Sequence, residues 1–299
     1  MAAPLHLFVN IPFCRERCAF CNRRVYLDSP AAQHDYVDAL LRELASAAPD
    51  LTDSEVVSVR LGGGSPTALA EAELLRLTDA IRHAFTISAD AEWTVEVSPN
   101  RVNTAWMVAF QRAGVNRLSV GMATGRQREC ELLGMCCNLP SAEVALILPQ
   151  MYHLASYEAV LLYGLPGETP DTLLTSAHFP VKYNAPEITF RRLEQPTGSA
   201  WLQKRLTLPE APVFPEKVRS YLAERGYTEY LPLRWCKPGH ESRDALGEAG
   251  GEDYLSLGAD TVSRTDGVVY RTEPDRLLYQ RHADDPERLY TVLGRAEIG

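Results

Sequence analysis

The sequence predicts an α/β protein, a partial (β/α)6 barrel with a small C-terminal β-hairpin extension. Strand-like runs alternate with amphipathic segments along most of the chain, which is typical of a parallel sheet with helical crossovers. About six such units can be distinguished, fewer than the eight of a closed barrel. The alternation stops toward the C-terminal end, where two extended runs flank an Asp-Gly pair. These three observations define the predicted fold class.

The predicted strands are short runs rich in β-branched and aromatic residues, and glycines such as Gly62 and Gly164 mark strand ends. They cover residues 5–11, 56–62, 93–98, 116–121, 159–164 and 187–193. Parallel strands joined by right-handed crossovers place their C-terminal ends at the same edge of the barrel. Functional side chains are therefore expected at that edge.

The predicted helices follow the strands. The first begins at Ser29-Pro30, an N-cap residue followed by proline, and its apolar residues recur at helical spacing (Tyr36, Leu40, Leu41 and Leu44). Similar patterns cover residues 71–85, 104–114, 141–154 and 215–226. The turn signal Asp266-Gly267 predicts the hairpin. We expect a barrel domain of residues 1–205 and an α+β extension of residues 206–299 packed on it.

Composition and charge favour small-molecule chemistry. The chain has 299 residues, 45% of them hydrophobic, and a net charge of −9 without clustered Lys and Arg, which argues against nucleic-acid and anionic-membrane partners. No run approaches the ~18 apolar residues of a membrane span, and the first residues do not resemble a signal peptide. Seven cysteines, an odd number with a local cluster, favour a reducing compartment, and we expect a cytoplasmic protein.

Three cysteines, Cys14, Cys18 and Cys21, follow the first predicted strand within "FVNIPFCRERCAFCNRR". Thiolates are soft ligands, and three of them can hold three irons of a cubane cluster while the fourth iron stays open. No fourth cysteine lies nearby in the sequence. Zinc is the alternative, and it would need a distant ligand such as His6 or His240. A site without metal also remains open.

The cysteine spacing resembles the signature of radical S-adenosylmethionine (SAM) enzymes. With the preceding "NIPF" it is similar to the branch that contains oxygen-independent coproporphyrinogen oxidase, related heme chaperones and natural-product methylases. Further motifs resemble that branch in order: "LGGGSPTAL" (61–69), "VEVSPN" (95–100), "GVNRLSVG" (114–121), "YGLPGET" (163–169) and "GYTEY" (226–230). The resemblance spans about residues 5–262.

The resemblance implies a [4Fe-4S] cluster on the three cysteines and SAM on its open iron, cleaved to a 5′-deoxyadenosyl radical. It further implies that Phe20 shields the cluster and that backbone at Leu162 meets the adenine. The residues that it places near the methionyl end of SAM are Gly62, Gly63, Gly64, Ser65 and Glu96. An electron donor such as flavodoxin or ferredoxin is expected.

Several of these features also have simpler interpretations. The glycines could form an ordinary turn, and Glu96 could be a solvated strand residue, although the inside of a barrel is the other possibility for it. Cys136 and Cys137 are expected to be buried structural residues, because free cysteine usually behaves as a small hydrophobic residue. His240 is left without a role.

The sequence also departs from the family. Phe8, Ala123, Met135 and Val160 stand where relatives have polar cofactor contacts, so a more apolar wall and weaker SAM binding are expected. The resemblance is not expected to extend to the relatives' C-terminal domain, and this expectation argues against tetrapyrrole decarboxylation and heme delivery.

The expected function is that of a radical SAM enzyme acting on a small, acidic metabolite in specialised biosynthesis; oxidoreductase, lyase and methylase types all remain open. Arg191 is the expected substrate-binding residue, because a guanidinium inside the barrel suits a carboxylate or phosphate. The alternative for Arg191 is an ion pair with Glu187 or Glu194. The alternative function is a non-catalytic carrier or partner protein that keeps the cluster but has a degenerate SAM site.

Overall fold

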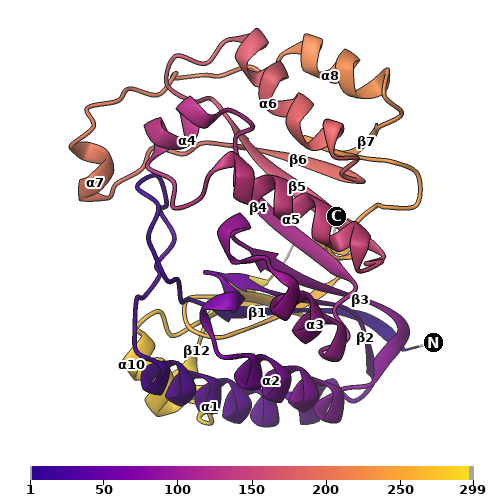
Figure 1. Cartoon of the computed structure of the whole chain (residues 1–299). Helices are drawn as coiled ribbons and strands as arrows, with labels where there is room; N and C mark the ends of the chain where they lie inside the picture. Colours follow the sequence, from indigo (N-terminus) through magenta and orange to yellow (C-terminus); the bar gives the residue numbers. More distant parts are fainter. Residues whose placement is uncertain (1, 296–299) are drawn as a thin grey trace.

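The computed structural model describes residues 2–295, and its strands form an open barrel wall with helices outside it (Figure 1). The six predicted parallel strands are confirmed, and their limits agree within about three residues except for the third strand, which begins six residues before its predicted start. They are β1 (Ala3–Ile11), β2 (Ser54–Gly63), β3 (Ile87–Val97), β4 (Arg117–Ala123), β5 (Ser156–Tyr163) and β6 (Glu187–Arg192). They lie side by side in chain order, and every neighbouring pair is parallel.

The sheet continues beyond the six strands at both edges and does not close. β8 (Arg234–Cys236) pairs antiparallel with β6, and β7 (Thr228–Leu231) pairs with β8. At the other edge β9 (Asp253–Leu257) pairs parallel with β1. The strand order is β12-β11-β10-β9-β1-β2-β3-β4-β5-β6-β8-β7. The partial barrel predicted from the number of repeats is therefore confirmed.

The predicted hairpin forms the outer part of this sheet. β10 (Val262–Thr265) and β11 (Val268–Thr272) are antiparallel, and Asp266 and Gly267 between them have φ of 50° and 72°. Two residues with positive φ are the requirement of a two-residue hairpin turn. β12 (Tyr290–Arg295), which the sequence did not indicate, pairs with β11. The predicted domain boundary near residue 205 stays a prediction. The strands that follow it lengthen the barrel sheet at both edges, β7 and β8 beside β6, and β9 to β12 beside β1.

The predicted helices are confirmed. They are α1 (Pro30–Ala47), α2 (Glu71–Ala84), α3 (Thr104–Arg112), α5 (Leu139–Met151) and α8 (Glu216–Ala223). The side chain of Ser29 caps α1 as expected. Helices not predicted are α4 (Gln127–Leu133), α6 (Pro170–Lys182), α7 (Ser199–Leu202), α9 (Arg243–Gly250), α10 (Arg276–His282) and α11 (Pro286–Leu289), with short 3₁₀ turns at η1 (Ala48–Leu51), η2 (Pro66–Ala68) and η3 (Pro99–Arg101). α1 and α2 lie along one outer side of the barrel (Figure 1).

The two faces of the barrel strands differ in chemistry. Outward side chains such as Val59, Val95 and Leu161 are buried and belong to the main hydrophobic core. Since side chains alternate along a strand, the residues between them point into the barrel. Several of those are charged, including Arg60 and Glu158. The barrel interior is therefore a polar, ion-paired space.

Arginines pair with the buried carboxylates of the interior. Arg60 lies 2.9 Å from Glu96, 3.5 Å from Glu158 and 3.5 Å from Asp244. Arg234 lies 3.2 Å from Glu158. Burial opposes ionisation of Glu158, but Arg234 and Arg60 outweigh it and keep its pKa well below the ordinary value. Pairing of this kind offsets the cost of burying these charges.

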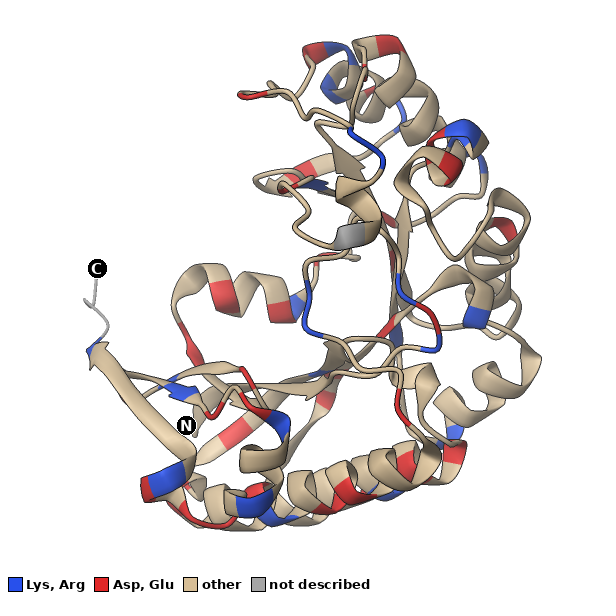
Figure 2. Cartoon of the chain, turned by 90° about the vertical axis from the view of Figure 1, so that its left-hand side faces the viewer, with Lys and Arg blue, Asp and Glu red and all other residues tan. Residues whose placement is uncertain are grey.

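No helix among the described residues is long and apolar enough to cross a membrane. On the face seen in Figure 2, basic and acidic residues are interspersed over the helices. In Figure 1 the indigo segment that follows β1 rises on the left between the lower and the upper parts of the molecule. That segment carries the predicted cysteine motif.

Candidate functional site

The cysteine loop leaves β1 and is closed at its base. Phe13 forms a β-bridge with Tyr26, and the Cys14 N–H donates to the Tyr26 carbonyl at 3.0 Å. The Phe13 ring is fully buried and packs edge-on against Tyr36 of α1, with 5.3 Å between ring centroids. An anchored base of this kind fixes where the following cysteines emerge.

Hydrogen bonds tie the cysteine loop to three other parts of the chain. The Ala19 N–H donates to the Gly134 carbonyl at 3.2 Å. Asn22 Nδ2 donates to the Gln195 carbonyl after β6 at 2.9 Å, and Arg24 Nη1 donates to the Pro274 carbonyl in the extension at 2.8 Å. The loop thus spans the open side of the barrel, and hydrogen bonds hold it to segments on both sides of the opening.

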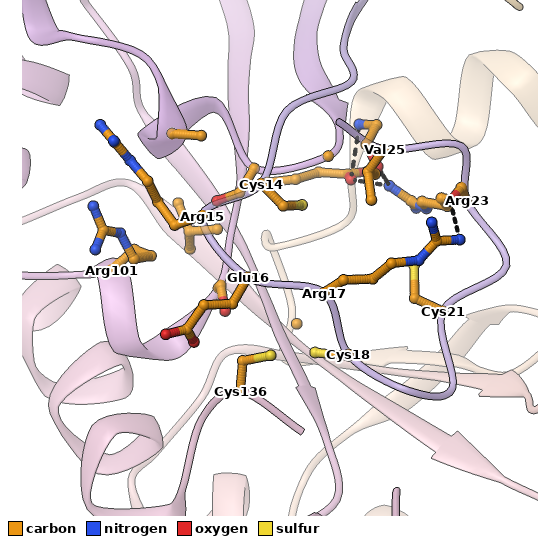
Figure 3. Close-up of a pocket in the computed structure, with 18 of the residues that line it drawn as sticks. Cys14, Arg15, Glu16, Arg17, Cys18, Cys21, Arg23, Val25, Arg101 and Cys136 are labelled. Carbon is orange, nitrogen blue, oxygen red and sulfur yellow. Dashed lines mark hydrogen bonds and ion pairs between the residues drawn. The ribbon is translucent and has the colours of Figure 1, made fainter. Parts of the chain in front are cut away.

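The three cysteines line one cavity of about 250 Å³ (Figure 3). All three are free thiols. Burial raises the pKa of Cys14 to about 11, and the nearby thiols of Cys21 and Cys18 contribute in the same direction. Because metal ligation requires the thiolate, loading this site would release protons. Other predicted site residues share the cavity wall: Phe20, Gly63, Gly64, Ser65, Glu96 and Arg191.

Neighbouring protein atoms leave no room for side chains in the glycine run at the end of β2, residues 62–64. A Cβ on Gly62 would lie 2.6 Å from the Glu96 carboxyl carbon, and one on Gly64 would lie 2.4 Å from the Phe13 carbonyl oxygen. Gly63 has φ of 92°, and a Cβ there would meet the Asn10 side chain. The glycines therefore let β2 approach both the base of the cysteine loop and Glu96. Close approach to a cofactor, which the resemblance implied, stays a prediction.

Glu96 points into the barrel, and the alternative of a solvated glutamate is wrong. Its side chain is 14% exposed and accepts hydrogen bonds from Arg60 Nε at 3.0 Å, Arg23 Nη1 at 2.7 Å and the Gly63 N–H at 3.3 Å. Burial works against the charge, yet Arg60 and Arg23 lower its pKa to about 2. Glu96 is thus a permanent anion at the cavity wall.

A second cavity of about 540 Å³ lies beside the first and shares Arg23, Gly63 and Arg191 with it. Its volume is within the usual range of small-molecule sites. Arg191 is exposed to these cavities and has no hydrogen bond or ion pair with another described residue. Burial lowers its pKa, and the opposing charges of Glu158 and Glu96 limit the shift.

The alternative partners of Arg191 are engaged elsewhere or do not reach it. Glu187 is fully buried and pairs with Arg117 and with Arg234. The neighbouring Arg192 turns the other way and donates to the Glu210 carbonyl at 2.7 Å. Of the two consecutive arginines, Arg191 is therefore the one that faces the cavities, as strand alternation predicts.

The four departures from the family do not form one wall. Val160 lines the first cavity, and Phe8 lines the second. Ala123 and Met135 lie in a small apolar cluster that also contains Leu162. Ala123 and Met135 line neither cavity, and the expectation that all four residues surround one cofactor stays a prediction. Phe20 contacts both regions: it lines the first cavity and packs against the same cluster.

Sequence reasoning missed several residues of the site. Cys136, expected to be buried and structural, is partly exposed and lines the first cavity. Its contact with the cysteine loop joins distant parts of the chain, so no local pattern could reveal it. Arg23 and Arg60 were also missed. Arg60 had a signal, since it alternates with Val59 and Leu61 in a strand whose other face is apolar.

The donor set fits an iron–sulfur cluster better than zinc. Among residues 2–295 no group of three or more His, Cys, Asp or Glu side chains converges on a single-ion site. In a cubane each thiolate binds a different iron, so three thiols around one cavity suffice. The distant histidines do not complete a zinc site: His6 bonds Ser58 and Glu252, and His240 bonds Ser156 at the start of β5.

Comparison with known proteins gives a consistent result. The sequence pattern of the Radical SAM superfamily matches residues 9–179. The heme chaperone HemW of Escherichia coli (strain K12) is 28% identical over 281 residues, which cover 91% of this chain and 74% of the relative. The oxygen-independent coproporphyrinogen III oxidase of the same strain is 25% identical over 302 residues, covering 94% and 66%.

A solved structure shares the fold. Coproporphyrinogen III oxidase (HemN) from Escherichia coli, described as a radical SAM enzyme, superposes with a TM-score of 0.83 and 23% identity over 97% of this chain and 71% of that one. At this identity the likeness establishes the fold. The sequence and fold comparisons together show a HemN/HemW-like chain.

Proposed function

We propose, from the premise that this chain belongs to the radical SAM superfamily, that it is an enzyme that reductively cleaves SAM and abstracts hydrogen from a small acidic metabolite. The observation that carries the substrate class is Arg191, a guanidinium without a protein partner among the described residues, on the wall common to two cavities. A guanidinium matches the geometry of a carboxylate or phosphate. The substrate is therefore proposed to sit in the second cavity.

Cys14, Cys18 and Cys21 are proposed to hold the [4Fe-4S] cluster, and the bound cluster and SAM supply the electron and the reactive carbon centre for hydrogen abstraction. Phe20 would cover the site and exclude water, since its ring lies between the cavity and an apolar cluster. Backbone at Leu162, in the same cluster, remains the proposed contact for adenine. A flavodoxin or ferredoxin is the proposed electron donor.

Gly63 and Glu96 are proposed to orient the amino-acid part of SAM. The Gly63 carbonyl and the Glu96 carboxylate are acceptors at the cavity wall, and a primary ammonium group needs such acceptors. Gly62, Gly64 and Ser65 are proposed to hold these acceptors in place. The Ser65 N–H donates to the Phe13 carbonyl at 2.7 Å and so ties the glycine run to the cysteine loop. The Ser65 hydroxyl is engaged with Thr67, so a positioning role fits it better than direct contact.

A carrier function is the second candidate, and two observations favour it. The HemW relatives are named heme chaperones, and Val160 lines the first cavity where the family has an aspartate. An arginine-rich second cavity would also accept the propionate groups of a heme. In this case the cluster and fold would be kept without productive SAM cleavage.

Anaerobic reconstitution with iron and sulfide, followed by reductant and SAM, separates the two functions. The enzyme function predicts about three to four irons per chain, no stoichiometric zinc, and formation of 5′-deoxyadenosine. A cluster without any 5′-deoxyadenosine, together with a heme Soret shift on titration, would favour the carrier. Stoichiometric zinc without iron would contradict both.

The substrate site is tested with Arg191→Met and the matched control Arg192→Met, whose side chain faces away from the cavities. Calorimetric titration with inorganic phosphate and with glutarate is expected to show binding to the wild type that Arg191→Met weakens about tenfold, since a charged hydrogen bond is worth about 1.5–3 kcal/mol. Equal affinities in the wild type and Arg191→Met would contradict the proposed substrate class.

A further inference from the structure

A second cysteine-bearing segment is docked onto the cysteine loop. Between α4 and α5 the chain makes a turn in which Gly134 has φ of 59°, and the Gly134 carbonyl accepts the Ala19 N–H at 3.2 Å. A Cβ on Gly134 would lie 2.9 Å from the Ala19 Cβ, so the two segments touch. Asn100 Nδ2 donates to the Cys136 carbonyl at 2.8 Å. Hydrogen bonds to the main chain on both sides of the turn therefore fix the position of Cys136.

The Cys136 thiol faces Cys18 within the cluster cavity (Figure 3). The backbone N–H and the thiol of Cys136 are placed to donate toward the Cys18 sulfur, and both oppose the rise that burial causes in the pKa of Cys18. The next residue, Cys137, belongs to the same turn but does not line the cavity. The turn thus presents one particular cysteine to one particular member of the motif.

We propose that Cys136 is a positioning residue of the cluster, which donates hydrogen bonds to the Cys18 sulfur and thereby makes the cluster easier to reduce. The proposal rests on the proposed cluster at Cys14, Cys18 and Cys21. Hydrogen bonds to ligand sulfurs are one of the factors that set the potential of iron–sulfur centres. Reduction adds negative charge that spreads onto the thiolates, so donors stabilise the reduced cluster more than the oxidised one.

A role for Cys136 as a fourth cluster ligand fits the geometry less well. Each terminal thiolate of a cubane binds its own iron, so ligand sulfurs are spread around the cluster. The Cys136 thiol instead faces the sulfur of Cys18. This contact is that of a donor to a ligand, and the fourth iron remains available.

The test is an EPR-monitored redox titration of reconstituted wild type, Cys136→Ala and Cys136→Ser, without SAM or substrate. Cys136→Ala is expected to keep its iron and sulfide content and to have a more negative midpoint, with the reduction equilibrium constant lowered about threefold to tenfold; tenfold corresponds to about 59 mV for one electron. Cys136→Ser keeps a donor and is expected to restore most of the shift. Cys137→Ser is the matched control and should leave the midpoint unchanged.

Three results would overturn the proposal. One is an unchanged midpoint in Cys136→Ala with a complete cluster. Another is loss of an iron in both Cys136→Ala and Cys136→Ser with unchanged circular dichroism, which would make Cys136 a ligand. The third is a wild type that assembles no cluster, which would also remove the proposed function. A shift in the midpoint of a protein that forms no 5′-deoxyadenosine would support the role of Cys136 while rejecting the enzyme function.

Discussion

At the scale of single residues, Arg23 holds the acceptors that a bound amino acid would need. Its Nη1 donates to the Gly63 carbonyl at 2.6 Å and to Glu96 Oε2 at 2.7 Å. Arg23 lies on the cysteine loop and on the wall between the two cavities. The ammonium group of a ligand at this wall therefore has to compete with the guanidinium of Arg23. The side chain is 46% exposed, which leaves it free to swing away.

Arg23→Met is expected to tighten SAM binding to the reconstituted protein several-fold. The substitution frees the Gly63 carbonyl and leaves Glu96 with Arg60 as its remaining arginine partner. Solvent screening of the half-exposed pair keeps the expected gain small. Arg24→Met is the control, because Arg24 bonds the Pro274 carbonyl and not the glycine run. Calorimetry decides, and weaker binding by Arg23→Met would mean that Arg23 contacts the cofactor directly.

At the scale of elements, the turn after β2 and the base of the cysteine loop act as one unit. The Gly64 N–H donates to the Ile11 carbonyl at 2.9 Å, and the Ser65 N–H donates to the Phe13 carbonyl at 2.7 Å. Ile11 and Phe13 are fully buried. The position of the cysteines therefore depends on how closely β2 approaches β1, and the absence of side chains in the glycine run permits this approach.

Gly64→Ala is expected to destabilise the protein by about 1–3 kcal/mol and to lower the iron content after reconstitution, because its Cβ would lie within 2.4 Å of the Phe13 carbonyl oxygen. Gly121→Ala is the matched control. Gly121 lines the same cavity, but the nearest atom to its added Cβ is 3.7 Å away. Urea unfolding and iron analysis measure both effects. Full stability and full iron content in Gly64→Ala would show that the two elements are not coupled.

At the scale of the whole molecule, a buried carboxyl joins the first helix to the C-terminal extension. Glu43 of α1 accepts hydrogen bonds from the Gly258 N–H at 2.7 Å, the Tyr279 hydroxyl at 2.7 Å and the Tyr290 hydroxyl at 3.1 Å. Burial raises the pKa of Glu43 to about 7, although these three donors oppose the shift. Packing of the extension on α1 is therefore coupled to protonation of Glu43.

The raised pKa gives a pH dependence with a defined sign. Between pH 4.5 and about 7 the folded protein holds a proton that the unfolded chain has lost, so the stability contributed by Glu43 falls as pH rises through this window. A shift from 4.5 to about 7 corresponds to at most about 3 kcal/mol. Glu43→Gln does not titrate, and its amide can replace the protonated carboxyl.

We expect the free energy of unfolding of Glu43→Gln, relative to that of the wild type, to rise by about 2–3 kcal/mol from pH 5 to pH 8. Urea unfolding at the two pH values measures this change. The exposed Glu287→Gln serves as the control and should show no such change. A pH-independent difference between wild type and Glu43→Gln would contradict the coupling.

The sequence by itself determined the order of strands and helices in the barrel, the hairpin and the cysteine motif. Each depends on local physics: period-2 and period-3.6 apolar patterns, the Asp266-Gly267 pair that accepts positive φ, and the close spacing of the thiols. α6 was missed because Pro180 interrupts the helical pattern in its last turn. Its capping box, Thr169 with Thr172, is the local signal for the start of this helix.

Only the tertiary structure decided which distant side chains meet. The placement of Cys136 against Cys18, of Arg23 on Glu96, and of Ala123 and Met135 away from the cavities depends on how loops dock across the open barrel. A strand pattern tells which side chains share a face, but not which loop lies above them. Long-range contacts of this kind arise when all strands are assembled, and no local pattern in the sequence encodes them.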